Sequence, residues 1–384
     1  MKIIKFFIYF LLSFILMISC NNDPITSDIE EYLKDLKKSD KPGCEVKYAK
    51  GFSIDYYDGI TKINVKNPLD KSQILNTYYL VKSDKLKSKF SGNKYVIQLP
   101  LERIAVFSGT QISSLLKLGH NNEIIGVSEA NYITIPKITE GISKGSIVEL
   151  ASNGEFYVET ALKLNPDLIF YSPYNVNESH PLAVTNILMV PYLDFKETTP
   201  LGRAEWIKFN AAFFGEENMA DSIFNNIESS YNHYVDMAKT AANRPSVLSD
   251  KPFAGQWYVP GGKSYIAQLF KDAGADYIWK DDNGVASFPL DYELVFKKAV
   301  HADFWRIVGS TNDKPSYEFL EKQNELFTHF DAFKNKKIIW CDARNTAYFE
   351  KGPLEPQVLL ADLIYCFHPE LMPDYQPVYY FLLN

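Results

Sequence analysis

The chain has 384 residues, of which 46% are hydrophobic and 15% aromatic, enough to build two domains with separate apolar cores. Its formal net charge of −7 argues against a nucleic-acid partner, because phosphate binding requires clustered Lys and Arg. Its four Cys and six His show no CxxC, HExxH or clustered spacing, so the sequence predicts neither a disulfide framework nor a structural metal site.

Residues 1–19 predict a signal peptide. Lys2 and Lys5 precede the apolar run 6–18, which is shorter than the roughly 20 residues that a spanning helix needs. The run ends in "LMISC", which resembles a bacterial lipoprotein signal. That resemblance implies a lipid on Cys20 and an exported chain, tethered to the periplasmic face of the cell membrane. The alternative is an anchor helix that stays on the chain.

The first segments after Cys20 are predicted to lie outside the main lobes. Residues 20–43 are charged and poor in apolar side chains, and indicate a tether with at most a short helix. In residues 44–100, short β-type runs surround the turn "YDGI", which predicts β-hairpins. We expect these hairpins to decorate the first lobe.

From residue 101 the pattern becomes α/β. "RIAVFS" predicts a short buried strand and "GTQISSLLKLG" the helix that follows it, and strands and helices continue to alternate as far as "ILMVPYLDF". Residues 101–202 therefore predict an N-terminal α/β lobe with a largely parallel sheet.

A long helical segment separates this lobe from a second one. Within residues 203–242, apolar side chains keep helical spacing over about 26 residues, or roughly 39 Å. Residues 243–384 then repeat the α/β pattern in "GGKSYIAQLFKDAGADYIW" and "KKIIWCDA". The predicted fold is α/β, with two Rossmann-like lobes joined by a single long linker helix and an N-terminal β-hairpin decoration. A disulfide between Cys341 and Cys366 is left open.

Two segments, one per lobe, resemble each other. "YVETALKLNPDLIFYSP" and "LDYELVFKKAVHADFWRIV" each place a Glu in the first turn of a helix that leads into an apolar strand. Together with "LLADLIYCFHPEL" and the long helix, this pairing resembles the cobalamin- and iron-siderophore-binding proteins of ABC importers, the class with one rigid linker helix. The resemblance covers roughly residues 101–384.

This resemblance implies a docking role for Glu159 and Glu293. In the family, one surface Glu on each lobe pairs with arginines of the membrane permease, which works with ATPase subunits. A carboxylate in the first turn of a helix is favoured by the helix dipole and can meet an Arg fork in bidentate geometry. The alternative is that both are ordinary first-turn glutamates. A lipid anchor would raise the effective concentration of the carrier near its permease.

The ligand is expected in the cleft between the lobes, at the C-terminal ends of the strands. Aromatic side chains with a few polar groups in these loops suit a large planar or macrocyclic ligand, although each could instead be a loop or core residue. The candidates are Tyr132, Tyr174, Trp257, Tyr258, Arg344 and Tyr348. Siderophore, haem and cobalamin stay open, but the lack of a basic cluster in these loops disfavours a highly anionic siderophore. No cofactor is expected.

Three rival functions fit less well. A zinc- or manganese-binding importer component of similar plan needs several converging His and carboxylate ligands, and only His180 falls in a predicted cleft loop. An enzyme would need a catalytic motif, and the sequence has no GxSxG, Walker loop or GxGxxG after a strand. "VPGGKSY" lacks the first Gly of a phosphate loop because position 257 is Trp. A purely structural lipoprotein would not need duplicated lobes.

Overall fold

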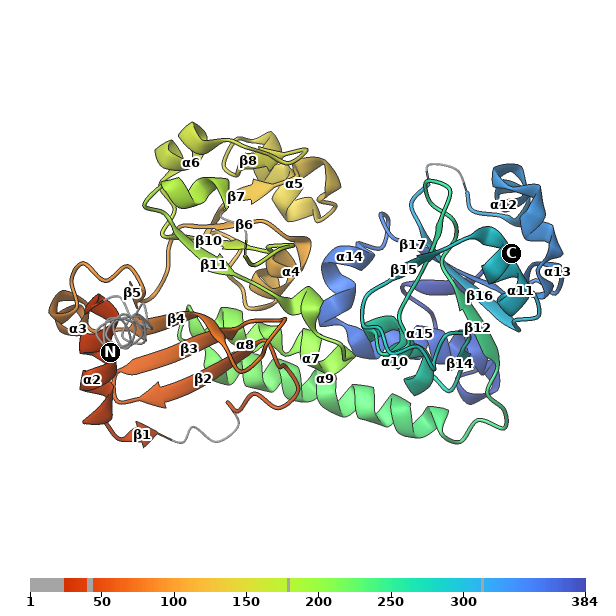
Figure 1. Cartoon of the computed structure of the whole chain (residues 1–384), viewed down its shortest axis with the longest axis horizontal. Coiled ribbons are helices and arrows are strands. Elements are labelled where there is room, and N and C mark those ends of the chain that lie inside the picture. The colour runs from red at the N-terminus through yellow and green to blue at the C-terminus, as the bar shows by residue number, and fades with distance from the viewer. Residues whose placement is uncertain (1–23, 40–43, 178–179, 312–313) are drawn as a thin grey trace, which may run out of the picture.

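The computed structural model describes residues 24–39, 44–177, 180–311 and 314–384. Figure 1 shows two α/β lobes joined along one side by the long helix α9 (Glu217–Ala238). Signal residues 1–19 and Cys20 lie outside the described residues. Within the described part, no helix is long and apolar enough to cross a membrane.

An N-terminal module of five strands precedes the first lobe. Its strand order follows the chain, and all pairs are antiparallel except the last, which is parallel. Gly59, with a φ of +74°, completes the expected turn between the second and third strands. The elements are α2 (Pro24–Lys34), β1 (Lys38–Ser39), β2 (Phe52–Tyr57), β3 (Ile60–Lys66), β4 (Ile74–Val81), α3 (Asp84–Lys89) and β5 (Val96–Gln98).

Both faces of this sheet are covered. Ile29 and Leu33, one helical turn apart on α2, are buried against one face, where they meet Tyr79. On the other face, Phe52 packs edge-on against Trp206 of the helix α8, with ring centroids 4.8 Å apart. Residues 24–39, which the sequence assigned to the tether, are therefore part of a folded sheet module.

The first lobe is built on a six-stranded sheet of order β11-β10-β6-β7-β8-β9, parallel except for β9. Helices in the crossovers bury its two faces, as a parallel sheet requires. Its elements are β6 (Ile104–Val106), α4 (Gly109–Lys117), β7 (Ile124–Ser128), α5 (Pro136–Ser143), β8 (Val148–Ser152), β9 (Glu155–Phe156), α6 (Val158–Leu164), β10 (Leu168–Tyr171) and β11 (Leu188–Pro191).

Three helices link the lobes, namely α7 (Pro200–Ala204), α8 (Trp206–Ala212) and α9. The predicted long helix is present, with 22 residues and a length of about 33 Å. Ala220, Phe224, Ile227 and Tyr231 follow helical spacing on its buried side. This stripe packs against α8 and against the last helix of the second lobe, so α9 is in contact with both halves of the molecule.

The second lobe has a five-stranded sheet of order β14-β12-β16-β17-β18, parallel except for β18, and a separate antiparallel pair β13-β15. Its strands are β12 (Ser246–Ser249), β13 (Trp257–Val259), β14 (Asp276–Tyr277), β15 (Phe288–Leu290), β16 (Phe304–Gly309), β17 (Ile338–Asp342) and β18 (Tyr380–Leu382). Its helices are α10 (Tyr265–Asp272), α11 (Tyr292–Ala299), α12 (Tyr317–Gln323), α13 (Asp331–Lys334), α14 (Tyr348–Lys351) and α15 (Pro356–Phe367). Cys341 and Cys366 are both buried and no disulfide joins them, and Cys44 is also a buried thiol outside any disulfide.

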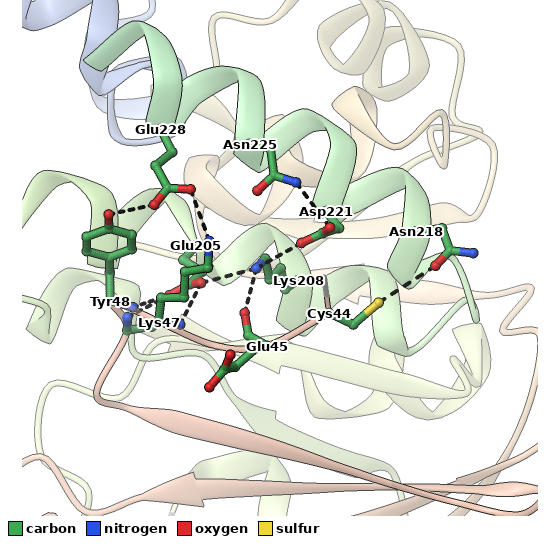
Figure 2. Close-up of polar contacts among 11 residues, drawn as sticks. Cys44, Glu45, Lys47, Tyr48, Glu205, Lys208, Asn218, Asp221, Asn225 and Glu228 are labelled. Carbon is green, nitrogen blue, oxygen red and sulfur yellow. Dashed lines mark hydrogen bonds and ion pairs between the residues drawn. The ribbon is translucent and has the colours of Figure 1, made fainter. Parts of the chain in front are cut away.

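Polar contacts fasten the chain between the N-terminal module and the linker (Figure 2). The buried carboxylate of Glu205 accepts hydrogen bonds from the backbone N–H of Lys47, at 2.9 Å, and from those of Tyr48 and Ala49, at 2.7 and 2.8 Å. Lys208 pairs with the same carboxylate at 3.2 Å. The Tyr48 hydroxyl donates to Glu228 on α9 at 2.6 Å. The module is therefore bonded to the helices that join the lobes.

Candidate functional site

Pockets lie where the parallel strands of each lobe end. In the first lobe, the residues at the C-terminal ends of β6, β7 and β10 form a pocket of about 330 Å³. We call it the aromatic pocket. It is lined by Phe107, Ser128, Glu129, Ala151, Phe156, Tyr171, Ser172, Pro173, Tyr174, Asn175, His180 and Pro181.

His180 is the polar centre of the aromatic pocket. Its ring lies edge-on to Phe156 and Tyr171, with centroids 4.4 and 5.0 Å apart. Nδ1 accepts a hydrogen bond from the backbone N–H of Leu182 at 3.1 Å, so in the neutral ring the proton is on Nε2. Burial lowers the pKa of His180, which favours this neutral form. His180 therefore adds one N–H donor to the aromatic surface of the pocket.

The second pocket takes residues from both lobes and from the linker. It has a volume of about 380 Å³, and we call it the arginine pocket. It is lined by Phe195, Glu197, Arg203, Asp250, Pro260, Ser264, Tyr265, Ile266, Val285, Ser287, Arg306, Val308, Tyr348, Phe349, Pro353 and Leu359. Such a composite wall is what a ligand site between two lobes requires.

Arg306 organises the arginine pocket. It lies in the middle of β16, only 3% exposed, and its Nη1 donates to Asp250 Oδ1 at 2.8 Å. Its Nη2 donates to the hydroxyls of Tyr348 and Tyr380, each at 2.9 Å. Its Nε has no partner among the described residues. A buried charge is tolerated only with such pairing, so this network holds the guanidinium in place and leaves one N–H unused.

Two phenols add unused hydrogen-bonding capacity. The oxygen of Tyr348 accepts from Arg306 and also from the Tyr380 hydroxyl, at 2.6 Å, so its own proton remains available. The buried Tyr265 hydroxyl has no partner within the described part of the chain. Burial raises the pKa of Tyr265 and of Tyr348, which keeps both hydroxyls protonated. The pocket can therefore donate to oxygen acceptors of a ligand.

The opposite wall comes from the linker side. Arg203 on α7 pairs through Nε with Asp194 Oδ2 at 3.1 Å, and its guanidinium carbon lies 5.4 Å from the centre of the Tyr265 ring. Glu197 accepts on Oε1 from the backbone N–H groups of Lys50 and Gly51, both at 2.8 Å. Acidic side chains thus accompany both arginines, and the pocket is close to electrically balanced.

Two of the predicted ligand contacts line a pocket. Tyr348 is part of the arginine pocket, and Tyr174, 91% exposed, is at the edge of the aromatic pocket. Tyr132, which is 75% exposed, lines neither pocket. Tyr258 on β13 and Arg344 after β17 are exposed and also lie outside both pockets.

Trp257 is placed differently from the expectation. Its side chain is 0% exposed, its Nε1 donates to the carbonyl of Ser249 at 3.0 Å, and its ring lies 5.6 Å from that of Trp305. Successive residues of a strand point to opposite sides, so Trp257 enters the core while Tyr258 faces solvent. As a correction, Trp257 is a core residue in this structure and is not a wall of the cleft.

Arg203, Tyr265 and Arg306 line the arginine pocket but were not predicted from the sequence. Arg306 had a detectable signal, because a charged residue inside the apolar run "FWRIVG" is rare unless it is paired. Arg203 and Tyr265 had none, since each is an ordinary member of a helix whose orientation only the tertiary fold determines.

The two predicted docking glutamates lie on the surface of different lobes. Glu159 is in the first turn of α6 and Glu293 in the first turn of α11, and both are exposed. Neither side chain forms an ion pair or hydrogen bond with another described residue. No group of three or more His, Cys, Asp or Glu that could hold a metal ion occurs in the described ranges.

Comparison with known proteins places the chain in a family. Residues 104–345 match the model of a family described as periplasmic binding protein. An uncharacterized lipoprotein of Methanocaldococcus jannaschii, MJ0878, is 28% identical over 378 residues, covering 91% of this chain and 86% of that protein. A second, MJ0872 of the same organism, is 25% identical and covers 77% of each chain.

Solved structures share the fold. FepB from Veillonella parvula, a TroA-like periplasmic binding protein, superposes with a TM-score of 0.57 and 17% identity, covering 75% of this chain and 97% of that one. IsdE of S. aureus in complex with heme gives a TM-score of 0.55 and 20% identity, covering 70% and 100%. At these identities the likeness concerns the fold alone.

Proposed function

Since this chain belongs to the periplasmic binding protein family, we propose that it is the ligand-binding component of an ABC importer for an iron chelate, haem or a corrinoid. The ligand would lie between the lobes and be delivered to a membrane permease. The observation that carries this proposal is the arginine pocket, whose walls come from both lobes and the linker, and in which the Tyr265 hydroxyl and the Arg306 Nε have no partner among the described residues. Such a carrier performs no chemistry of its own.

The charge of the arginine pocket favours some ligands over others. Arg306 is paired with Asp250 and Arg203 with Asp194, while Glu197 adds another carboxylate. A ligand with several negative charges would meet these carboxylates, whereas neutral carbonyl or hydroxamate oxygens could accept from the free hydroxyls and the Arg306 Nε. We therefore favour a hydroxamate-type iron chelate or a corrinoid with amide side chains over a catecholate.

Haem is the second candidate. The aromatic pocket offers flat apolar surface that suits a porphyrin. However, His180 uses Nδ1 to accept a backbone hydrogen bond, so its neutral ring has no free nitrogen lone pair for iron. Haem would require another axial ligand, and Tyr174 at the pocket edge is the exposed phenol nearest to this surface.

Docking and anchoring complete the proposal. Glu159 and Glu293 would meet arginines of the permease, and their exposure without a partner among the described residues supports this role. A lipid on Cys20 would hold the carrier at the membrane, in line with the lipoprotein names of the two relatives. The test is to compare uptake by cells that carry Glu159→Ala and Glu293→Ala with ligand binding by the same purified variants. Uptake should fall while binding is unchanged.

Ligand identity can be tested by intrinsic tryptophan fluorescence of residues 21–384. A ferric trihydroxamate, a ferric tricatecholate, haemin and cyanocobalamin would be titrated in parallel. Tyr265→Phe should weaken binding of the ligand about fivefold, the worth of one hydrogen bond. Tyr132→Phe, outside both pockets, is the matched control and should bind as the wild type does. Quenching by none of the four, with zinc raising the melting temperature instead, would favour a bare-metal carrier.

A further inference from the structure

The lobes touch at the short helix α14, beside the arginine pocket. α14 follows β17 in the second lobe and packs on α4 of the first lobe, as Figure 1 also shows. Its first residue, Tyr348, lines the arginine pocket, and its third, Glu350, is only 6% exposed. One turn of helix therefore carries both a pocket residue and a buried carboxylate at the contact between the lobes.

The carboxylate of Glu350 is satisfied from the other lobe. It accepts a hydrogen bond from the backbone N–H of Thr134 at 3.0 Å, and a second from the Thr134 hydroxyl. Thr134 precedes α5 of the first lobe and is 216 residues away in the chain. A buried carboxylate without donors is costly, so the two lobes are held together at this point.

The close approach of α14 to α4 depends on Gly109, the first residue of α4. A Cβ at this position would lie 2.5 Å from Glu350 Cγ and 3.3 Å from its Cα. Atoms do not approach that closely, so any other residue here would push α14 away from α4. The contact between α14 and the first lobe therefore depends both on the missing side chain at residue 109 and on the bonds from Thr134 to Glu350.

We propose that Glu350 is a positioning residue of the ligand site. Its bonds to Thr134 hold the lobes at a fixed separation and keep Tyr348 against Arg306, whose Nη2 donates to the Tyr348 hydroxyl at 2.9 Å. Loss of the contact lets the lobes separate and removes one wall of the arginine pocket. The link between the lobes stands on geometry alone, while its effect on ligand release rests on the proposed function.

The contact can be tested without any ligand, by the distance between spin labels at Lys163→Cys and Lys297→Cys. Both positions are exposed and lie in different lobes, and the three native cysteines of the described chain are buried. Unaltered, the labelled chain should give one narrow distance distribution. Thr134→Val, which keeps the shape but loses the hydroxyl, and Glu350→Ala should add a longer and broader population.

Thr134→Ser keeps the hydroxyl and should restore the narrow distribution, which a merely structural defect would not do. Gly109→Ala reaches the same contact from the other side, and should broaden the distribution even if Thr134→Val folds poorly. Unchanged distributions in Thr134→Val, Glu350→Ala and Gly109→Ala would overturn the proposal.

Ligand release gives the second readout. For whichever of the four fluorescence probes the wild type binds, Thr134→Val should dissociate about tenfold faster, because hydrogen bonds to a charged group are strong. An unchanged off-rate in a variant with separated lobes would show that Glu350 does not position the site. If the wild type binds no probe, the proposed ligand class fails, and the label distances still decide whether the contact holds the lobes.

Discussion

The aromatic pocket lies within one lobe, whereas the arginine pocket takes its walls from both lobes and the linker. In the aromatic pocket the aromatic rings contact one another, and each contact contributes a small part of the stabilising energy. In the second, a buried charge depends on several hydrogen bonds at once. The aromatic pocket should therefore lose stability gradually on truncation, while the arginine pocket should lose it abruptly when the charge at its centre is removed.

The largest effect is expected from Arg306→Met. It leaves Asp250, Tyr348 and Tyr380 without their shared donor in a buried site, and should lower the free energy of unfolding by about 3–5 kcal/mol. Urea unfolding monitored by circular dichroism measures it. The exposed Arg344 provides the control, since Arg344→Met should stay within about 0.5 kcal/mol. Equal effects from the two substitutions would contradict the proposed network.

An intermediate effect is expected in the aromatic pocket. Phe156→Ala removes a ring that contacts Phe107 and His180, at centroid distances of 6.2 and 4.4 Å. The free energy of unfolding should fall by about 2 kcal/mol, the worth of one largely buried aromatic side chain. Phe156→Leu should cost less, as expected of a graded apolar contact. A loss as large as that of Arg306→Met would remove the distinction between the pockets.

Tyr348→Phe should have a smaller effect. It deletes one acceptor of the Arg306 Nη2, but that nitrogen keeps the Tyr380 hydroxyl at 2.9 Å. A loss of about 1 kcal/mol is expected, and the double variant with Tyr380→Phe should lose more than the sum of the single losses. Thermal or urea unfolding of the three variants measures this coupling. Strict additivity would mean that the two phenols act independently.

The smallest effect is a pH dependence that His180 should give the aromatic pocket. Burial holds the pKa of His180 below its ordinary 6.5 in the folded state, so the unfolded chain binds more protons as the pH falls through that region. The neutral ring's contribution is present above about pH 6.5 and is lost below it. From about pH 7.5 to 5.5, the wild type should lose more stability than His180→Asn.

Burial also lowers the pKa of His368. This residue contributes equally to the pH dependence of the wild type and of His180→Asn, so its effect cancels when the two are compared. The tyrosines of the arginine pocket have raised pKa values and stay protonated over this range, so Tyr348→Phe should not alter the slope. If the slope of stability against pH changed in Tyr348→Phe and not in His180→Asn, the assignment of the pH dependence to the aromatic pocket would be wrong.

Periodicity was enough to predict the fold. Apolar spacing on α9 and the alternation of short strands with helices depend only on local sequence, and the two lobes with their linker helix are confirmed. The tether was assigned by composition, which overlooked that Ile29 and Leu33 share one face of α2. Few apolar residues are enough when a neighbouring sheet supplies the rest of the core.

The site was harder to predict, because loop position does not fix side-chain direction. Trp257 and Tyr258 are adjacent in one strand, yet one is fully buried and the other is 42% exposed. The arginines of the pocket lie on a strand and a helix and not in the loops in which ligand contacts were predicted. The guanidinium of Arg306 depends on Asp250 and Tyr348, both more than 40 residues away, which no local pattern reveals.

Five consecutive backbone amides, from Lys47 to Gly51, donate to the carboxylates of Glu205 and Glu197. The N-terminal sheet is therefore not a detachable part of this chain. A chain cut before the first lobe would leave two carboxylates buried without their donors, so in this protein the lobes depend on the sheet for stability. The match to MJ0878, which extends over 91% of this chain, reaches into the N-terminal sheet.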